Sequence, residues 1–257
     1  NWAPWAPGFK NQILRKLIPR PLKDFVNRRI DLIQIRQFRE LVKIWSKAEQ
    51  LRSNYGTIFP LKPLSYSCLT QFQYCPNIQF LEVGSFLGFT SNFLIDNFLQ
   101  GKDSTLTCID PWVEYSKSTE NSIEGYDVII NDNTYNIFKE NTSRNVDKLR
   151  VQRGLSKDIL PTLTTKFHFI FIDGDHSTSA VWKDAVLSLR LLLKGGYILF
   201  DDYNWNEGKS NPKQAIQHFE KCFSDKVQFI PTYNNQRLYR LVAELDPNEK
   251  YDLDYFS

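Results

Sequence analysis

Short apolar runs that end abruptly in a glycine or an acid recur from residue 78 onward, and segments with helical spacing separate them. Runs of this length are typical of strands and too short for buried helices. The runs are IQFLEVG (78–84), STLTCID (104–110), KLRVQRG (148–154), FHFIFID (167–173) and YILFDD (197–202). Because helices between parallel strands must cross over the sheet, this alternation predicts a parallel sheet with helices on both faces.

The segments around these runs carry helical and turn signals. FTSNFLIDNFL (89–99) follows a glycine turn, VWKDAVLSLRLLLKGG (181–196) ends in glycines, and PKQAIQHFEKCF (212–223) begins with a proline, which suits a first helical turn. KVQFIPTY (226–233) and QRLYRLVAEL (236–245) flank an Asn-Asn pair and predict a closing hairpin. The predicted fold class is α/β, with a Rossmann-like, doubly wound, mostly parallel sheet and a C-terminal antiparallel hairpin.

Three units are expected along the chain. Residues 1–70 are predicted to be a helical N-terminal extension, 71–245 the main domain, and 246–257 an acidic tail. The stretch between Asp110 and Leu149 is long for a connection between a strand and a helix, so it is predicted to form a lid over the ligand crevice.

The composition favours a globular protein. A chain of 257 residues that is 42% hydrophobic can bury one large core. No apolar run approaches the roughly 20 residues that span a bilayer, and the opening NWAPWAPGFK lacks the apolar stretch of a signal peptide. The four cysteines show no paired spacing, which favours reduced thiols. A cytoplasmic protein without a membrane partner is therefore expected.

The charge is distributed unevenly. Residues 1–53 hold twelve Lys and Arg against four acids, although the net charge of the whole chain is only +3. A basic segment of this kind suits nucleic acid, an anionic membrane or an acidic partner subunit. A solvated helix face is the simpler explanation. If the segment has a specific role, self-association into a homo-oligomer is the one expected. Nucleic acid is not the expected partner.

Three acids stand at the ends of two predicted strands. Asp173 ends one run, and Asp201 and Asp202 end another. In an open parallel sheet the carboxyl ends of the strands face the ligand crevice, so these carboxylates should converge there. Burying unpaired carboxylates is costly, which favours a hard metal ion between them. The simpler alternative is that they cap helices or form turns.

A glycine turn follows the first run. Glu82 and Gly84 begin the pattern E-x-G-x-x-x-G, which Gly88 completes, and such glycines let a ligand approach the backbone closely. The pattern is not the dinucleotide fingerprint, and no phosphate-binding lysine follows it. Asp110, at the tip of the second run, is placed to accept hydrogen bonds from a ribose diol. A turn residue before Pro111 is the alternative.

Four motifs in this order resemble those of class I S-adenosylmethionine-dependent methyltransferases. They are EVGSFLGFTS (82–91), RGLSKDILPTL (153–163), FIDGDHS (171–177) and KGGYILFDDY (194–203). Together they are similar to the metal-dependent, catechol O-methyltransferase-like group. The DGD and DDY forms look closer to the macrocin O-methyltransferase-like branch, which acts on sugars in natural products. The resemblance covers about residues 78–205.

The resemblance implies an S-adenosylmethionine-dependent, divalent-metal-dependent O-methyltransferase. Its acceptor would be a small hydroxylated molecule. A sugar or natural-product glycoside is expected in preference to a phenol. It implies that Asp173, Asp201 and Asp202 bind Mg²⁺ or another divalent cation. The implied contacts to S-adenosylmethionine come from Glu82, Gly84, Ser85, Gly88, Asp110, Gly154, Ser156 and Asp173.

Two residues are candidates for the general base that takes the acceptor's proton. His176 occupies a position at which the catechol-type family that this chain resembles carries Lys. Asp175 matches the acid of the sugar-type branch. Either residue could instead serve at the start of a helix. His168 and His218 are expected to be structural.

Two other functions fit parts of the sequence. A nucleic-acid or amine methyltransferase would suit the basic segment, but the run that ends in IDGD lacks the Asn/Asp-Pro-Pro-aromatic signature of amine-directed relatives. A non-catalytic, cofactor-binding interaction module is the second alternative. The three mutually repelling acids argue against this alternative, because a site that has lost its catalytic function has no need to keep them.

Overall fold

The structure is a computed structural model that describes residues 63–113, 132–206, 211–232, 235–246 and 249–256. Most of the predicted N-terminal helical extension, with its basic segment, lies outside the described residues. So does the first half of the predicted lid. Within the ranges given above, no helix is both long and apolar enough to cross a membrane.

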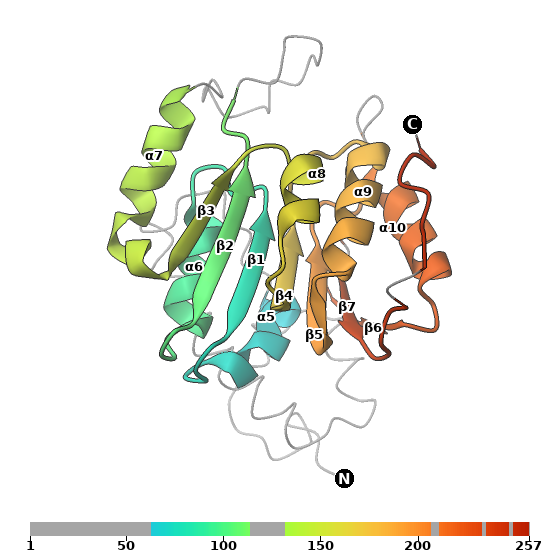
Figure 1. The fold of residues 1–257 in the computed structure, drawn as a ribbon, viewed down its shortest axis with the longest axis horizontal. Helices are drawn as coiled ribbons and strands as arrows, with labels where there is room; N and C mark the ends of the chain where they lie inside the picture. Colours follow the sequence, from blue (N-terminus) through green and yellow to red (C-terminus); the bar gives the residue numbers. More distant parts are fainter. Residues whose placement is uncertain (1–62, 114–131, 207–210, 233–234, 247–248, 257) are drawn as a thin grey trace, which may run out of the picture.

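Among the described residues, a seven-stranded sheet forms the centre of the fold, in the order β3-β2-β1-β4-β5-β7-β6 (Figure 1). Strands β1 to β5 pair in parallel, and β7 pairs antiparallel with both β5 and β6. The bounds are β1 (Gln79–Val83), β2 (Thr105–Asp110), β3 (Leu149–Arg153), β4 (Phe167–Ile172), β5 (Leu192–Phe200), β6 (Val227–Ile230) and β7 (Arg237–Leu241). The predicted α/β fold class, including the closing hairpin, is confirmed.

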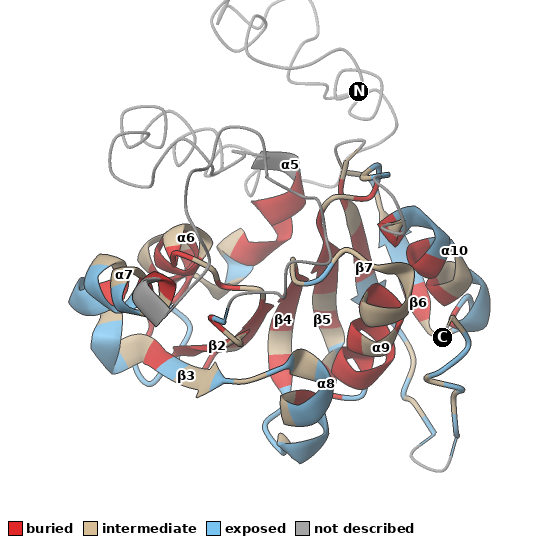
Figure 2. Ribbon diagram, turned by 90° about the horizontal axis from the view of Figure 1, so that it is seen from above, coloured by how far each residue is buried: buried red, intermediate tan, exposed pale blue. Residues whose placement is uncertain are grey.

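Helices cover both faces of this sheet. Helices α8, α9 and α10 pack on one face, and α5 and α6 on the other (Figures 1 and 2). The described helices are α5 (Pro63–Tyr66), η1 (Ser67–Phe72), α6 (Phe89–Phe98), α7 (Asp132–Thr142), η2 (Ser143–Lys148), α8 (Ser156–Ile159), η3 (Leu160–Thr162), α9 (Thr178–Leu189) and α10 (Pro212–Cys222). The described part of the predicted lid is thus α7 and η2, and α7 lies beside α6 at the edge of the fold.

Neighbouring residues of the central strands point into two separate cores. In β5, Ile198 and Phe200 belong to the core under α9 and α10, and Leu199 belongs to the core under α5 and α6. All three are essentially buried. Because both faces are covered, the central strands are mostly apolar, and this is why the sequence located them well.

The predicted helix 181–196 is wrong at its C-terminal end. Helix α9 ends at Leu189, and β5 already begins at Leu192, which pairs with Phe167. The register then shifts, so that Phe169 pairs with Tyr197. The leucine-rich stretch fits a helix end and a strand start equally well by periodicity. The glycine pair that suggested a helix stop lies in this irregularity inside the strand.

Residues 249–256, expected as a separate acidic tail, pack against α9 and α10. The Trp182 indole Nε1 donates to the carbonyl of Asp252 at 2.7 Å, and Lys183 pairs with Asp254 at 2.9 Å. The ring of Tyr255 stacks on His218 with 4.0 Å between centroids. The described part of the tail therefore belongs to the folded domain, and His218 contributes to that packing.

Candidate active site

The carboxyl ends of four neighbouring strands meet along one edge of the sheet. Backbone hydrogen bonds continue one residue past the strands, from Gly84 N to the Ile109 carbonyl, from Asp173 N to the Val83 carbonyl and from Asp201 N to the Ile172 carbonyl. Asp110 ends β2 on the same edge. The residues that follow the strands therefore lie side by side, as the parallel topology predicts.

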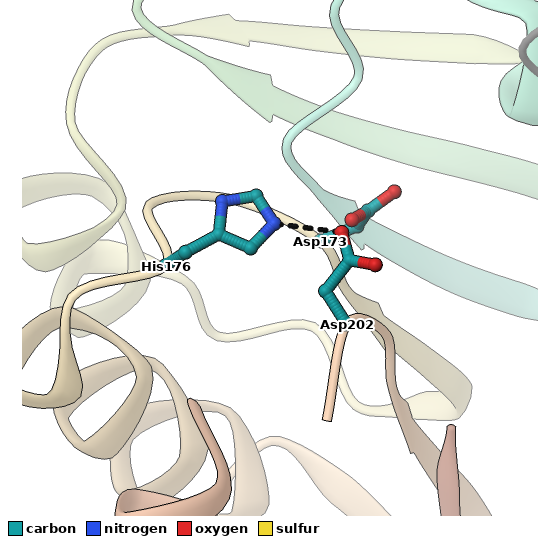
Figure 3. A group of neighbouring side chains, drawn as sticks. All are labelled: Asp173, His176 and Asp202. Carbon is teal, nitrogen blue, oxygen red and sulfur yellow. Dashed lines mark hydrogen bonds and ion pairs between the residues drawn. The ribbon is translucent and has the colours of Figure 1, made fainter. Parts of the chain in front are cut away.

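Two of the predicted metal ligands lie close together, and a histidine joins them. One ligand atom from each of Asp173, His176 and Asp202 lies within 4.8 Å of the other two (Figure 3). His176 Nε2 is 2.8 Å from Asp202 Oδ2. Asp173 follows β4, Asp202 follows β5, and His176 comes from the loop that leads into α9. All three residues are half-buried, so solvent reaches part of each of them.

Asp201, the third predicted ligand, is not part of this group. Its side chain is buried, with Oδ2 accepting from Gln236 Nε2 at 2.9 Å and Oδ1 accepting from the Asp202 backbone N–H at 2.8 Å. Gln236 is fully buried as well. The carboxylate of Asp201 therefore fastens the hairpin to the end of β5, and His176 stands where a third acid was expected.

Asn235 holds Asp202 in place. Its amide Nδ2 donates to Asp202 Oδ1 at 2.9 Å, its Oδ1 accepts from the Asn204 N–H at 2.9 Å, and its carbonyl accepts from the Tyr203 N–H at 2.9 Å. Asp202 has a φ of +49°, a left-handed conformation that aspartate tolerates better than most residues. The sequence indicated Asn235 only as a turn residue and did not indicate this contact.

A small pocket lies beside the group and includes both candidate bases. Asp173, Asp175 and His176 line it together with Asp201. The side chain of Asp175 is exposed, and its Oδ1 accepts from the Ser177 N–H at 2.7 Å. Asp175 thus serves at the start of α9 through one oxygen. The ring of His176 lies 5.1 Å from that of Trp205, which partly covers it.

The glycines of the turn are required by the packing of the chain itself. Gly84 has a φ of +87°, and a Cβ there would lie 2.0 Å from the backbone oxygen of Asp173. Gly88 has a φ of +79°, and a Cβ there would lie 2.4 Å from Thr142 Cγ2. The sequence pattern predicts that both glycines let a ligand approach the backbone. The close approach of neighbouring chain segments, the end of β4 at Gly84 and α7 at Gly88, is a second reason for glycine at these positions. At Gly84 this packing alone requires glycine.

Glu82 lies buried beneath this turn. Its Oε2 accepts from the hydroxyls of Ser85, at 2.8 Å, and Ser91. The thiol of Cys108 is 3.5 Å from the same oxygen. Its Oε1 is buried and has no hydrogen-bond partner among the described residues. Burial raises the pKa of Glu82 to about 7. The predicted cofactor residues Glu82 and Ser85 therefore contact each other, and one carboxyl oxygen remains for a donor.

Replacing Glu82 by Gln should flatten the dependence of stability on pH. The folded protein holds a proton on Glu82 up to about pH 7, whereas the unfolded chain releases it near the ordinary value of 4.5. Stability should therefore fall as pH rises between these values, by at most about 3.5 kcal/mol at about 1.4 kcal/mol per pKa unit. Thermal unfolding from pH 4.5 to 8 measures this slope. Glu140→Gln, at an exposed site on α7, is the matched control, and equal slopes in Glu82→Gln and wild type would contradict the prediction.

Asp110 joins the end of β2 to the glycine turn. Its Oδ2 accepts from the Phe86 N–H at 2.9 Å, and its Oδ1 accepts from the Trp112 N–H at 2.7 Å. Burial raises the pKa of Asp110, and these backbone hydrogen bonds offset part of that rise. Each carboxylate oxygen keeps a second lone pair. The carboxylate is thus oriented beside the turn and can still accept a hydrogen bond.

Ser156 and Gly154 lie at the next strand end, beside Asp110. The Gly154 N–H donates to the Asp110 carbonyl at 3.0 Å. Ser156 begins α8 and lies near Asp184, a fully buried acid of α9. Burial raises the pKa of Asp184 to about 7. The sequence placed Asp184 in a helix and gave no sign of this contact, because it depends on how α9 packs against α8.

The other two histidines lie away from the strand-end group, which is formed by Asp173, His176 and Asp202. His168 is in β4, where its Nδ1 accepts from the Gln79 N–H at 3.1 Å and its ring packs against Phe72. His218 lies on α10 under the C-terminal residues. Both serve the packing of the domain, which agrees with the expectation for them.

Comparisons with known proteins show what this fold is similar to. Residues 81–203 match the model of a methyltransferase domain family. The uncharacterised protein R132 of Acanthamoeba polyphaga mimivirus is 28% identical over 162 residues, which cover 62% of this chain and 67% of that protein.

Two solved structures share the fold at low identity. The O-methyltransferase TomG of Streptomyces achromogenes, solved in complex with S-adenosylmethionine, is 14% identical with a TM-score of 0.51, and 84% and 92% of the two chains are covered. A putative rRNA methylase of Clostridium thermocellum is 12% identical with a TM-score of 0.52, and 70% and 94% are covered. Residues 81–203 of this chain therefore match a methyltransferase domain, and the chain shares the fold of these two solved methyltransferases, in agreement with the resemblance of its motifs.

Proposed function

We propose that this methyltransferase transfers the methyl group of S-adenosylmethionine to a hydroxyl of a small acceptor with the help of a divalent cation. The proposed acceptor is a sugar or a natural-product glycoside in preference to a phenol. The observation that carries the proposal is the convergence of Asp173, His176 and Asp202 at the carboxyl edge of the sheet, next to the glycine turn. A cation ligand set beside a cofactor turn is what the activation of a hydroxyl needs.

The residues around the glycine turn fit the proposed methyl donor. S-adenosylmethionine would supply the electrophilic methyl group. Asp110 offers carboxylate lone pairs for a ribose diol, and Glu82 Oε1 is an acceptor without a partner among the described residues. Ser156, at the start of α8 near Asp184, supplies a polar edge for the adenine. Gly84, Ser85, Gly88 and Gly154 complete the proposed contacts by shaping the backbone around them.

The strand-end group fits a divalent cation by the chemistry of its donors. Two carboxylates and an imidazole are ligands that divalent metals accept. A cation held there would lower the pKa of an acceptor hydroxyl and fix its direction. Asp173 and Asp202 provide the negative charge, and Asn235 orients Asp202 through Oδ1. Asp201 supports the site by fastening Gln236 to the end of β5.

The acceptor's proton has two candidate bases, Asp175 and His176, and both line the pocket. Asp175 is exposed and uses one oxygen for the Ser177 N–H, which leaves the other oxygen for a proton. His176 has its Nε2 directed at Asp202. The imidazole Nε2 is therefore engaged with a carboxylate, whereas the side chain of Asp175 is exposed to solvent.

A screen of acceptors with radiolabelled S-adenosylmethionine tests the function directly. Sugars, phenols and RNA are offered separately, each with and without EDTA. Transfer to a hydroxylated small molecule that EDTA inhibits supports the proposal. Transfer to RNA would favour the nucleic-acid alternative, and cofactor binding without transfer to any acceptor would favour an interaction module.

Asp110→Ala should weaken the binding of S-adenosylhomocysteine measured in EDTA. The cofactor residues are separate from the strand-end group, so binding should not need a metal. The lost hydrogen bonds should lower the affinity at least about fivefold, equivalent to roughly 1 kcal/mol. Titration calorimetry measures the change, and Asp147→Ala, at an exposed site on η2, is the control. An affinity within about twofold of wild type would remove the ribose-binding role of Asp110.

A further inference from the structure

The identity of the third ligand at the strand ends decides which metal the site prefers. We infer that His176 coordinates the cation through Nε2 together with Asp173 and Asp202, and that this mixed set selects a transition-metal ion such as Mn²⁺, Fe²⁺ or Co²⁺ over Mg²⁺. The inference rests on the proposed function, whose metal site it specifies. It departs from the three-acid set that the sequence motifs imply.

The spacing of His176 and Asp202 agrees with adjacent ligands of a shared ion. Nitrogen and oxygen ligands lie about 2.1 Å from ions of this size, so two ligands at right angles lie about 3 Å apart and two opposite ligands about 4.2 Å apart. His176 Nε2 and Asp202 Oδ2 are 2.8 Å apart, and all three ligand atoms lie within 4.8 Å of one another. The hydrogen bond between His176 and Asp202 therefore brings the donors to the spacing that an ion requires.

Asp201 is already engaged by other groups. Both of its oxygens accept hydrogen bonds, one from the fully buried amide of Gln236 and one from the backbone of Asp202. Its side chain is buried, whereas the side chains of His176 and Asp202 are 31% and 26% exposed. Recruiting Asp201 would strand the Gln236 amide without its acceptor, which is costly in a buried place. His176 and Asp202 are the more exposed donors and are not tied to a buried amide in this way.

Surrounding residues orient the two exposed donors. Asn235 occupies Asp202 Oδ1 and leaves Oδ2 directed at His176. The ring of Trp205 lies beside that of His176, with 5.1 Å between the ring centroids. Contacts of this kind, which fix the direction of a ligand, are a regular part of metal sites.

The nitrogen donor is what changes the metal preference. Mg²⁺ takes oxygen ligands almost exclusively, whereas imidazole suits iron, nickel, copper and zinc; carboxylates suit magnesium, calcium and manganese alike. A set with one imidazole and two carboxylates therefore favours first-row transition ions. With Nε2 on the ion, His176 cannot also take the acceptor's proton through that atom, which leaves Asp175 as the base.

Pulsed electron paramagnetic resonance of bound Mn²⁺ tests this directly, because it detects a coordinated imidazole nitrogen. The chain contains three histidines, so the source of a signal can be assigned. Wild type should show the nitrogen coupling and bind Mn²⁺ at least about tenfold more tightly than Mg²⁺ in calorimetry. His176→Gln should lose the coupling and at least about tenfold in Mn²⁺ affinity, the usual scale for a disturbed metal site. The control His218→Gln, on α10, should change neither.

The possible failures can be told apart. Wild type that binds Mn²⁺ without a nitrogen coupling would overturn the role of His176 and leave the proposed metal-dependent function in place. A coupling that persists in His176→Gln would overturn it as well. Wild type that binds neither ion would overturn the metal dependence itself. The spectrum of wild type decides the main point even if a variant fails to fold.

Discussion

Asp173→Ala is expected to lower the rate of methyl transfer at least about 10²-fold, the scale seen when an electrostatic contact to the reacting oxygen is lost. Asp173 is common to the three-acid set and to the set with His176. Its loss leaves two ligands, which should bind a divalent ion far less tightly. The acceptor hydroxyl would then lose both its anchor and the lowering of its pKa.

Single-turnover rates with saturating S-adenosylmethionine measure this effect on the chemical step. Calorimetry with S-adenosylhomocysteine should show that the cofactor still binds, because the glycine turn and Asp110 remain intact. Asp201→Ala is the matched comparison. It should lower the melting temperature as well as the rate, because it strands the buried amide of Gln236. Full activity of wild type in excess EDTA would rule out a metal at this edge of the sheet.

The positions of the strands could be read from the sequence because the helices bury both faces of the sheet. Each central strand is then a short, mostly apolar run; β2 ends at an acid, Asp110, and another acid, Asp173, directly follows β4. The start of β5 could not be read in this way. A leucine-rich stretch joins α9 to β5, and only the pairing of Leu192 with Phe167 shows where the helix has ended.

The strand-end acids could be predicted because parallel topology brings the carboxyl ends of strands to one edge. The distribution of roles among them could not. Asp201 and Asp202 are adjacent in sequence, yet one is buried against Gln236 and the other faces His176. That difference depends on the antiparallel pairing of β5 with β7, which brings Asn235 and Gln236 to the end of β5. A side chain's partner on a distant hairpin leaves no local pattern in the sequence.

Gly84→Ala is expected to destabilise the fold more than any other single substitution considered for this site. The sequence suggested that Gly84 admits a ligand, but an added Cβ would lie 2.0 Å from the Asp173 oxygen and 2.5 Å from its carbonyl carbon. Both atoms belong to the backbone, so neither can rotate away. The ends of β1 and β4 would have to separate, and a loss above about 3 kcal/mol is expected, toward the upper range for single substitutions.

Gly195→Ala separates the steric clash from backbone strain. Gly195 has a φ of +86°, nearly that of Gly84, but the nearest atom to an added Cβ is the Arg240 Nη2 at 3.7 Å, which is ordinary contact. Its cost should be only the roughly 1 to 2 kcal/mol of a left-handed residue. Urea unfolding of both variants measures the difference. If Gly84→Ala were no less stable than Gly195→Ala but bound S-adenosylhomocysteine poorly, ligand approach would explain the glycine. If it unfolds far more readily, the packing of β1 against β4 requires Gly84 before any ligand binds.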